Sequence, residues 1–443
     1  MSETIVAIAS PPGMGAVSVI RLSGSRAFEI ATSVMKGKHL PEPRRVGLRS
    51  VYDNAGRVID EGLLITFEGP GSYTGENVVE FTGHGGIMVT RRVLERFVEV
   101  GATPAEPGEF TQRAFMNGRM DLTQAEAVMD LISAQTSLAL RSANEQLDGR
   151  LGRTCEEIRA KLLGATAHVE AFIDFPEEDI DPEVGEVLCK ALREQSTLIA
   201  GLLATADQGR ILREGVRTVI FGKPNVGKSS LLNRLLGYQR AIVSSREGTT
   251  RDTIEEVVNL QGIPLRLIDT AGVRESSDEI EQEGIAMTHG QVARADLVLV
   301  IRDLSESLAE SAEVDIPDGA RRLDILNKSD LEDASWAEVK GLRISCESGD
   351  GFEDLEIAIA ELLSFDEAHW GDHSVAVNAR HQACLTRAQS SLSRAIASLQ
   401  ASDEPELTAL DLREALTAVG EIAGIVDTEE ILGEIFNNFC IGK

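Results

Sequence analysis

The sequence Gly222-Lys-Pro-Asn-Val-Gly-Lys-Ser229 decides the fold of the second half of the chain. It follows the apolar run 217–221 and precedes the helical pattern 230–236. In a strand–loop–helix setting, G-x-x-x-x-G-K-S predicts a loop that wraps its backbone N–H groups around the phosphates of a nucleotide. The positive end of the following helix favours the same anions. We expect Lys228 to reach the β- and γ-phosphates and the Ser229 hydroxyl to bind Mg²⁺.

A second motif, Asn327-Lys-Ser-Asp330, indicates which base is bound, because it follows the strand-like run 322–326. Guanine presents two adjacent donors, N1–H and the 2-amino group, which one carboxylate accepts together. Adenine lacks that pair. We therefore expect Asp330 to select GTP over ATP, although the same residue in isolation would be a surface turn aspartate. The segment 345–347 is placed to cover the base through its backbone.

A third motif, Asp269-Thr-Ala-Gly272, follows the strand-like run 265–268. Its carboxylate suits Mg²⁺, usually through water, and the Gly272 N–H can meet the γ-phosphate. Thr250, between this motif and the phosphate loop, is the expected switch threonine on Mg²⁺. The predicted GTP-binding residues are Asn225, Val226, Gly227, Lys228, Ser229, Ser230, Ser244, Thr249, Thr250, Asp269, Thr270, Ala271, Gly272, Asn327, Lys328, Asp330, Ser345 and Cys346.

The position after this third motif is Val273, where small regulatory GTPases carry the glutamine that orients the attacking water. Valine cannot do this chemistry, so catalysis has to come from elsewhere. The acidic segment 274–284 follows directly. One of its carboxylates could orient or activate water, or the segment could be a solvated acidic face; chemistry alone leaves both open.

The remaining sequence predicts a multidomain chain that combines α/β and all-α parts. Short strands are expected at 4–9, 17–22, 63–67 and 78–81, with a helix at 87–100. From Thr123-Gln-Ala-Glu126, which fits a capping box, the chain reads as helical to about residue 212, with its only sharp interruption at 174–176. A strand–loop–helix pattern then runs to about 365. Helical patterns return at 376–399 and 407–436 and are expected to pack against the first helical stretch, because each alone leaves an apolar face exposed.

Composition narrows the class of protein further. Charged residues make up 26% and hydrophobic residues 42%, as in a globular protein, and no apolar run reaches the length of a membrane span. We expect a cytoplasmic location without membrane attachment. The five cysteines form no C-x-x-C pair, so neither a zinc knuckle nor a disulfide framework is indicated. The net charge of −29 argues against indiscriminate nucleic-acid binding but not against one specific RNA.

Motifs at both ends of the chain carry a family resemblance. They are Ile5-Val-Ala-Ile-Ala-Ser-Pro-Pro-Gly13, Gly83-His-Gly-Gly86, Pro107-Gly-Glu-Phe-Thr-Gln-Arg-Ala-Phe115 and Phe439-Cys-Ile-Gly-Lys443. Together with the GTPase motifs and Gly248-Thr-Thr-Arg-Asp252, they resemble the tRNA-modification GTPase family MnmE, also called TrmE, over essentially the whole chain. The resemblance implies an aminomethyltransferase-like α/β domain at 1–118 that binds folate and dimerises. It also implies a discontinuous helical domain at 119–212 and 372–443, with a Ras-like P-loop GTPase domain inserted at 213–371.

The resemblance also implies an activity and its partners. With the flavoprotein MnmG, which carries FAD and forms a heterotetramer with it, such a protein adds an aminomethyl or carboxymethylaminomethyl group to C5 of the wobble uridine of tRNA. The one-carbon donor is a tetrahydrofolate derivative, 5-formyl- or 5,10-methylene-. K⁺-dependent dimerisation of the GTPase domains stimulates hydrolysis. The alternative is a GTP-driven ribosome-assembly or RNA-binding switch without covalent chemistry, but that class usually brings a basic RNA-binding module and leaves the two ends of the chain unexplained.

Individual roles follow from the resemblance residue by residue. Asn225 matches the K⁺ ligand, with carbonyls of Ser244, Arg246 and Thr249 completing the shell, and Glu281 matches the catalytic glutamate, which favours the functional interpretation of the acidic segment. Arg246 and Glu247 are charged where relatives have smaller or apolar residues, which bears on K⁺ affinity. The folate site is implied at Arg21, Glu80, Arg119 and Lys443.

The remaining implied residue is Cys440, a functional cysteine near the folate site. A buried structural thiol is the plain alternative, and the Cys440-Ile-Gly-Lys443 end fails the prenylation pattern. Glu80 could read the pterin edge of folate as Asp330 reads guanine, because both rings present a 2-amino group beside a ring N–H.

Overall fold

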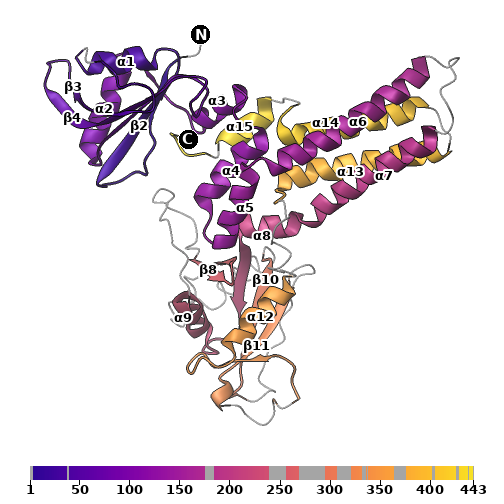
Figure 1. Cartoon of the computed structure of the whole chain (residues 1–443). Helices are drawn as coiled ribbons and strands as arrows, with labels where there is room; N and C mark the ends of the chain where they lie inside the picture. Colours follow the sequence, from indigo (N-terminus) through magenta and orange to yellow (C-terminus); the bar gives the residue numbers. More distant parts are fainter. Residues whose placement is uncertain are drawn as a thin grey trace. The chain divides into compact units, whose positions relative to one another are not determined.

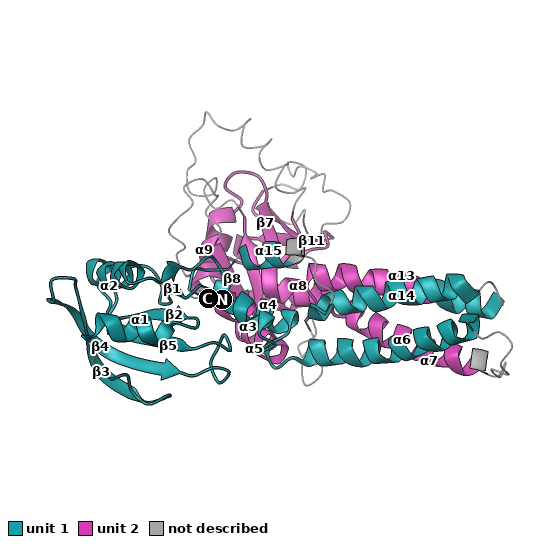
Figure 2. Cartoon of the chain, turned by 90° about the horizontal axis from the view of Figure 1, so that it is seen from above, with its two compact units in different colours: residues 1–129, 147–185, 394–443 teal, residues 130–146, 186–393 magenta. Residues whose placement is uncertain are grey.

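The computed structural model describes residues 3–36, 39–174, 184–238, 256–268, 295–306, 321–331, 336, 338–363, 376–401, 405–425, 429–437 and 439–442. These residues form two compact units, coloured separately in Figure 2. Unit 1 comprises 1–129, 147–185 and 394–443, and unit 2 comprises 130–146 and 186–393. Each unit is therefore assembled from segments far apart in the sequence. The domain boundaries expected at 118, 212 and 371 stay predictions.

Unit 1 begins with a six-stranded sheet in the order β3-β4-β5-β2-β1-β6. The strands are antiparallel except for β1 beside β6. Helices α1 and α2 pack on the sheet (Figure 1), and their buried apolar residues share one core with it. The bounds are β1 Ile5–Ile8, β2 Val17–Ser23, α1 Ala27–Val34, β3 Val46–Tyr52, β4 Val58–Phe67, β5 Val78–His84, α2 Ile87–Glu99 and β6 Thr103–Pro104. The expected strands and helix are present; α1 and β3 had not been predicted.

The helical stretches lie beside one another, although the residues that join them are 193 and 243 positions apart in the sequence. Within unit 1, α6 (Arg150–Asp174) runs along α14 (Pro405–Ala423), as Figure 1 shows, and Arg413 pairs with Glu170 at 2.7 Å. Within unit 2, a 2.6 Å bond from Gln389 to Ser196 joins α13 (Ala379–Ala401) to α7 (Val184–Ala204). This is the packing expected from their apolar faces. No helix among the described residues combines the length and the apolarity that a bilayer crossing needs.

The helix that the capping box at 123–126 predicts starts two residues earlier than expected. Helix α4 spans Leu122–Ser133, and Asp121 caps it: its Oδ1 accepts the Gln124 N–H at 2.9 Å, while Gln124 Oε1 accepts the Asp121 N–H at 3.0 Å. The expected register was wrong because T-x-x-E and D-x-x-Q both fit the motif. Thr123 is instead buried and donates to Asp121 at 2.6 Å. Gly152 leaves space for the Asp121 carboxylate, since a Cβ on Gly152 would lie 2.0 Å from Asp121 Oδ2.

The helical region is also more broken than predicted. Besides the end of α6 at Asp174, helices end at Ser133, Leu147 and Ala204. The further helices in the region are α3 Glu109–Met116, α5 Ser137–Leu147, α8 Ala206–Glu214 and α15 Glu429–Asn437. Glycines with positive φ follow several of the helices, among them Gly149 after α5 and Gly424 after α14. The helical pattern expected at 407–436 corresponds to two helices, α14 and α15. Helical periodicity continues through such short turns, so it hides them.

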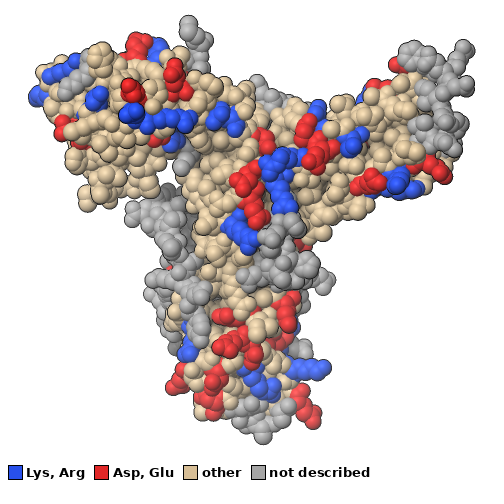
Figure 3. Space-filling model, viewed as in Figure 1, with Lys and Arg blue, Asp and Glu red and all other residues tan. Residues whose placement is uncertain are grey.

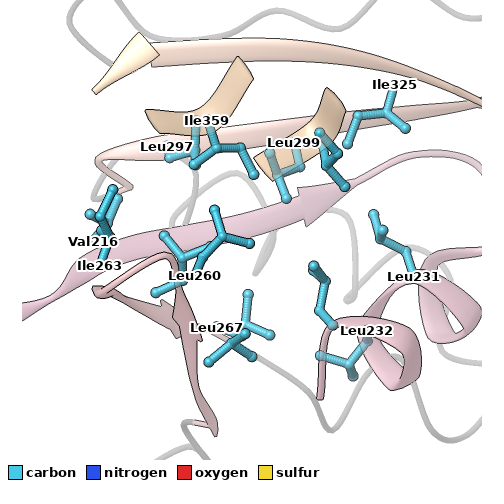
Figure 4. Packing of buried hydrophobic residues seen from close by; sticks show 14 of the residues in the cluster. Val216, Leu231, Leu232, Leu260, Ile263, Leu267, Leu297, Leu299, Ile325 and Ile359 are labelled. Atoms are coloured by element: carbon cyan, nitrogen blue, oxygen red, sulfur yellow. The ribbon is translucent and has the colours of Figure 1, made fainter. Parts of the chain in front are cut away.

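Unit 2 contains a second six-stranded sheet, in the order β12-β11-β10-β7-β9-β8. All neighbours are parallel except β8 and β9. The bounds are β7 Val216–Phe221, α9 Lys228–Tyr238, β8 Glu256–Leu260, β9 Ile263–Leu267, β10 Leu297–Asp303, β11 Arg321–Asn327, β12 Leu342–Arg343 and α12 Phe352–Leu362. Leucine and isoleucine side chains from the sheet and helices fill its core (Figure 4). Because β7, β10 and β11 are parallel, their carboxyl ends at Phe221, Asp303 and Asn327 share one edge, where such sheets bind ligands.

We expect Asp121→Ala to lower the free energy of unfolding by about 1–2 kcal/mol, because the carboxylate that accepts the Gln124 N–H and the Thr123 hydroxyl is lost. Urea unfolding of the full chain measures this. Asp148→Ala, an exposed aspartate in the turn before α6, is the matched control and should change stability by less than about 0.5 kcal/mol. Equal effects of both substitutions would show that Asp121 is not the cap.

Candidate nucleotide-binding site

The phosphate loop connects β7 to α9, as the sequence predicts. The chain leaves the sheet at Phe221, and the helix begins at Lys228. Asn225 and Gly227 both have positive φ, +65° and +104°. A Cβ on Gly227 would lie 2.1 Å from Nδ2 of Asn327, so only glycine permits this approach. Val226 has a buried side chain and can offer a nucleotide only its backbone.

The Asn327 side chain joins the phosphate loop to the segment expected to cover the base. It is almost fully buried at the end of β11. Its Nδ2 donates to the Val226 carbonyl at 2.8 Å, and its Oδ1 accepts the Cys346 N–H at 3.1 Å. Both polar ends of the amide are therefore satisfied by backbone groups 101 and 19 residues away. The sequence places Asn327 in a nucleotide motif, and the structure gives it the position of a strut between two loops.

Lys228 lies across its own loop. Its Nζ donates to the Gly222 carbonyl at 2.6 Å and the Lys223 carbonyl at 3.1 Å. Partial burial lowers the pKa of Lys228, because desolvation disfavours the charged form. Neutral carbonyls are weaker partners for an ammonium group than phosphate oxygens are. The loop thus presents a half-buried cation, with Ser229 and Ser230 beside it at the exposed start of α9.

Lys328 and Asp330 lie on the turn that follows β11. Lys328 has a positive φ of +64° and pairs through Nζ with Asp303 at the end of β10. Asp303 also accepts the Ser305 N–H at 2.8 Å and its hydroxyl at 2.6 Å. Burial alone would raise the pKa of Asp303, but the bonds from Lys328 and Ser305 hold it below its ordinary value. Asp330 sits in the short 3-10 turn Ser329–Leu331, exposed beside the buried pair.

The base-covering segment 345–350 is a tight loop that braces itself. Ser345 is buried; its N–H donates to the Asp350 carbonyl at 3.0 Å, and its Oγ accepts the Ser348 N–H at 3.1 Å. Cys346 is half-buried, and burial raises the pKa of its thiol to about 11, with Arg234 opposing the shift. The thiol therefore stays neutral at pH 7. Backbone groups are the polar atoms that this loop can offer a base.

Sequence reasoning missed two residues of this site. Asp303 is an acid that ends an apolar strand, the same signal that drew attention to Asp269, and it was overlooked because no motif surrounds it. Arg234 lies within an apolar helix, and its partners are more than 110 residues away, so no local pattern could reveal it. Other predicted residues lie outside the described part of the chain: Ser244, Arg246, Thr249, Thr250, Asp269, Thr270, Ala271, Gly272, Val273, Glu281 and Lys443.

In unit 1, the structure brings two of the predicted folate residues together. Arg21 on β2 pairs with Glu80 on β5 at 2.8 Å, and its guanidinium lies 5.5 Å and 5.7 Å from the ring centroids of Tyr73 and Phe110. Cation–π contact on two sides fixes the arginine and hence the carboxylate. Glu80 retains 27% of its side-chain exposure, so a ligand can reach it.

The C-terminal segment lies on the same sheet. Arg21 Nη1 donates to the Gly442 carbonyl at 3.5 Å, and Ile441 forms a β-bridge with Pro107. Gly442 has φ +98°, and a Cβ there would meet the Ile8 carbonyl at 2.4 Å. Cys440 is exposed, unlike a buried structural thiol. Arg119 is also exposed and lies against Gly75, two residues from Tyr73.

Comparison with known proteins now assigns the family. A family model described as the MnmE helical domain matches residues 122–440, and one described as the GTP-binding protein TrmE N-terminus matches 4–119. The tRNA modification GTPase MnmE of Akkermansia muciniphila is 50% identical over 445 residues, which cover 100% of this chain and 99% of that protein. This chain belongs to the MnmE family. The MnmE protein of Geobacter sulfurreducens is 44% identical over 454 residues and that of Aquifex aeolicus 42% over 452, each with 100% of both chains covered.

Membership of the MnmE family confirms the fold class predicted from the sequence. The TrmE-type N-terminal part contains the first sheet, and the match to the MnmE helical domain spans both helical stretches. The second sheet, with its phosphate loop after β7, is the P-loop part. As members of the family are tRNA modification GTPases by name, the recognition made from the motifs at the two ends of the chain is also confirmed.

We expect Asn327→Ala to weaken GTP binding by at least about tenfold and to lower the free energy of unfolding by about 2 kcal/mol, because it leaves two backbone groups without their partner. Fluorescent-nucleotide titration and thermal unfolding measure the two effects. The matched control is Asn259→Ala, which removes a single 2.8 Å bond to the Gly262 N–H at the β8–β9 turn. Unchanged GTP affinity in Asn327→Ala would show that GTP binding does not depend on the link that Asn327 makes between the two loops.

Proposed function

We propose that this chain hydrolyses GTP as a component of tRNA wobble-uridine modification, acting with the flavoprotein MnmG to place an aminomethyl or carboxymethylaminomethyl group on C5 of uridine 34. The observation that carries the nucleotide half is the Asn327 strut, which sets a phosphate loop and a base loop at one sheet edge. Membership of the MnmE family, with a relative 50% identical over the full chain, supports the role in tRNA modification. It also favours an enzyme over an assembly factor without covalent chemistry.

In this proposal GTP lies along the carboxyl edge of the second sheet. Its phosphates replace the two carbonyls that Lys228 now contacts, and guanine places its N1–H and 2-amino group on Asp330. Ser229, Thr250 and Asp269 would hold Mg²⁺. The exposed hydroxyl at the start of α9 fits a hard cation, which prefers oxygen ligands.

Hydrolysis in this proposal uses two groups in place of the absent glutamine. Glu281 would orient water, and Asn225 with the carbonyls of Ser244, Arg246 and Thr249 would hold K⁺, which would supply positive charge beside the transferred phosphoryl group. Asn225 is exposed on the phosphate loop, at φ +65°, so its side chain is accessible to a ligand at the rim of that loop. A ligand at that rim fits a cation bound when two GTPase domains of a homodimer meet.

A tetrahydrofolate derivative, 5-formyl- or 5,10-methylene-, would bind at Glu80 and Arg21, with Arg119 and Lys443 toward its glutamate tail. The fixed, accessible carboxylate of Glu80 fits the paired donors of a pterin edge. Folate would supply the one-carbon unit. The chain's own contribution there is orientation, together with the exposed Cys440 thiol on the adjoining C-terminal segment.

The charge distribution indicates where the tRNA polyanion meets least repulsion. Residues 1–118 carry 12 Lys and Arg against 13 Asp and Glu, so nearly all of the net −29 belongs to the rest of the chain. On the face drawn in Figure 3, blue side chains are frequent over the N-terminal sheet domain. We propose that the modified uridine approaches this domain, which would also hold the folate.

We expect purified Glu281→Ala to bind GTP as the wild type does but to hydrolyse it at least about 100-fold more slowly, because a water-orienting carboxylate is lost. Wild-type hydrolysis should be much faster in KCl than in NaCl. Cells in which Glu281→Ala replaces the wild type should accumulate tRNA with unmodified C5 at the wobble uridine, read by nucleoside mass spectrometry.

Three results separate the parts of this proposal. Normal wobble nucleosides in cells that lack the protein altogether would reject the tRNA function and favour the assembly-factor alternative. Equal rates in KCl and NaCl would reject the cation role of Asn225. Loss of GTP binding in Glu281→Ala would give that glutamate a structural role instead of a catalytic one.

We expect Glu80→Gln to weaken 5-formyltetrahydrofolate binding by about 10- to 100-fold, since an amide cannot accept two donors as a carboxylate does. Isothermal titration of the full chain measures the affinity. Glu95→Gln, on the exposed face of α2 where it pairs with Arg91 and Arg92, is the control and should bind normally. Unchanged binding in Glu80→Gln would place the pterin elsewhere.

A further inference from the structure

Arg234, on the helix that follows the phosphate loop, gathers three successive carbonyls of the base-covering loop. Its Nη1 donates to the carbonyls of Cys346 and Glu347 at 3.3 Å and 3.2 Å, and its Nη2 donates to that of Ser348 at 3.2 Å. The guanidinium also lies 5.5 Å from the ring centroid of Phe352, the first residue of α12. A planar fork held against an aromatic ring has one preferred orientation. Arg234 is thus the side chain that ties α9 to the loop.

The loop is shaped around this guanidinium. A Cβ on Gly349 would lie 1.8 Å from Nη2 of Arg234, and Gly349 has a φ of +96°. The backbone conformation therefore favours glycine at this position, and a side chain there would displace the Arg234 guanidinium. The contact is a built feature of the loop and not a surface arginine that happens to lie nearby.

The contact also fixes the direction of one amide. In a trans peptide unit the C=O and N–H point in opposite directions, so a carbonyl held by Arg234 turns the next N–H away from it. The amides after Glu347 and Ser348 are used inside the loop: Ser348 N–H donates to Ser345 Oγ and Gly349 N–H to the Ser345 carbonyl. The N–H of Glu347 belongs to the same peptide unit as the Cys346 carbonyl. It has no acceptor among the described residues.

We propose that Arg234 is a positioning residue that aims the Glu347 N–H at the 6-oxo group of guanine. This inference rests on the proposed GTP site and deepens it, because it names the side chain that holds the base-covering loop in place to donate to the base. Asp330 would accept the N1–H and 2-amino donors, and the loop would donate to the 6-oxo acceptor. A cation on the far side of the peptide unit also polarises it, which makes its N–H a better donor.

Two guanine analogues separate these two readings. Inosine diphosphate keeps the 6-oxo group and N1–H but lacks the 2-amino group. 6-Thioguanosine diphosphate keeps N1–H and the 2-amino group, and its sulfur is a weak acceptor in place of oxygen. A defect in the loop should therefore change the preference for GDP over the thio analogue and leave the preference over inosine diphosphate unchanged.

The experiment titrates GDP and both analogues against the full-length wild type, Arg234→Gln and Arg234→Lys, by competition with a fluorescent GDP. We expect Arg234→Gln to bind GDP and inosine diphosphate each about tenfold more weakly, and to lose most of the preference for GDP over the thio analogue. Arg234→Lys should not restore it, because lysine cannot bind three carbonyls with a fixed fork.

The matched control is Arg322→Gln, which breaks an arginine–carboxylate pair with Asp324 near the amino end of β11 and should preserve all three affinities. An equal loss for GDP and both analogues in Arg234→Gln would overturn the inference, since it would show general damage to the domain. Equal wild-type affinity for GDP and the thio analogue would overturn it as well, because the 6-oxo group would then go unread. Failure of the wild type to bind GDP would instead reject the proposed function itself.

Discussion

The buried amide of Asn327 is the interaction on which the nucleotide site depends. It ends β11 with one polar atom on the phosphate loop and the other on the base loop, so neither loop can shift without breaking a buried hydrogen bond. Leaving one of those backbone groups unpaired in the interior costs more than the bond itself contributes. The glycine at 227 is a consequence, because the amide occupies the space that a side chain there would need. Arg234 also holds the base loop, through the carbonyls of Cys346 and Glu347.

Most of the fold could be predicted from local patterns, and the exceptions have a physical cause. The phosphate loop and the strands that flank it follow from composition at short range, because glycine, lysine and apolar runs each have a local meaning. The start of α4 could not be fixed, since two overlapping capping boxes were equally good in sequence; the deciding fact is the space beside Gly152, on another helix. The turns at Gly149 and Gly424 are short enough to preserve helical periodicity across them.

For the site, motif residues could be predicted and their supports could not. Asp330 was predicted from the chemistry of guanine and Arg21 and Glu80 from the family resemblance, but the pairing of Arg21 with Glu80 was not predicted. Asp303 and Arg234 escaped because their partners, at 328 and at 346–348, are distant in sequence and one set consists of backbone carbonyls. Backbone acceptors are present at every position, so no residue pattern marks the ones that matter.

The two lysines of the site illustrate why such supports matter for binding. Lys328 is paired with the buried carboxylate of Asp303, a partner that a nucleotide has no means of replacing. Lys228 contacts two neutral carbonyls while burial lowers its pKa, so its charge is incompletely satisfied. Phosphate oxygens would offer it full negative charge and raise that pKa again. The first lysine is therefore fixed in place by a buried partner, whereas the second keeps an incompletely satisfied charge that an anion would pair.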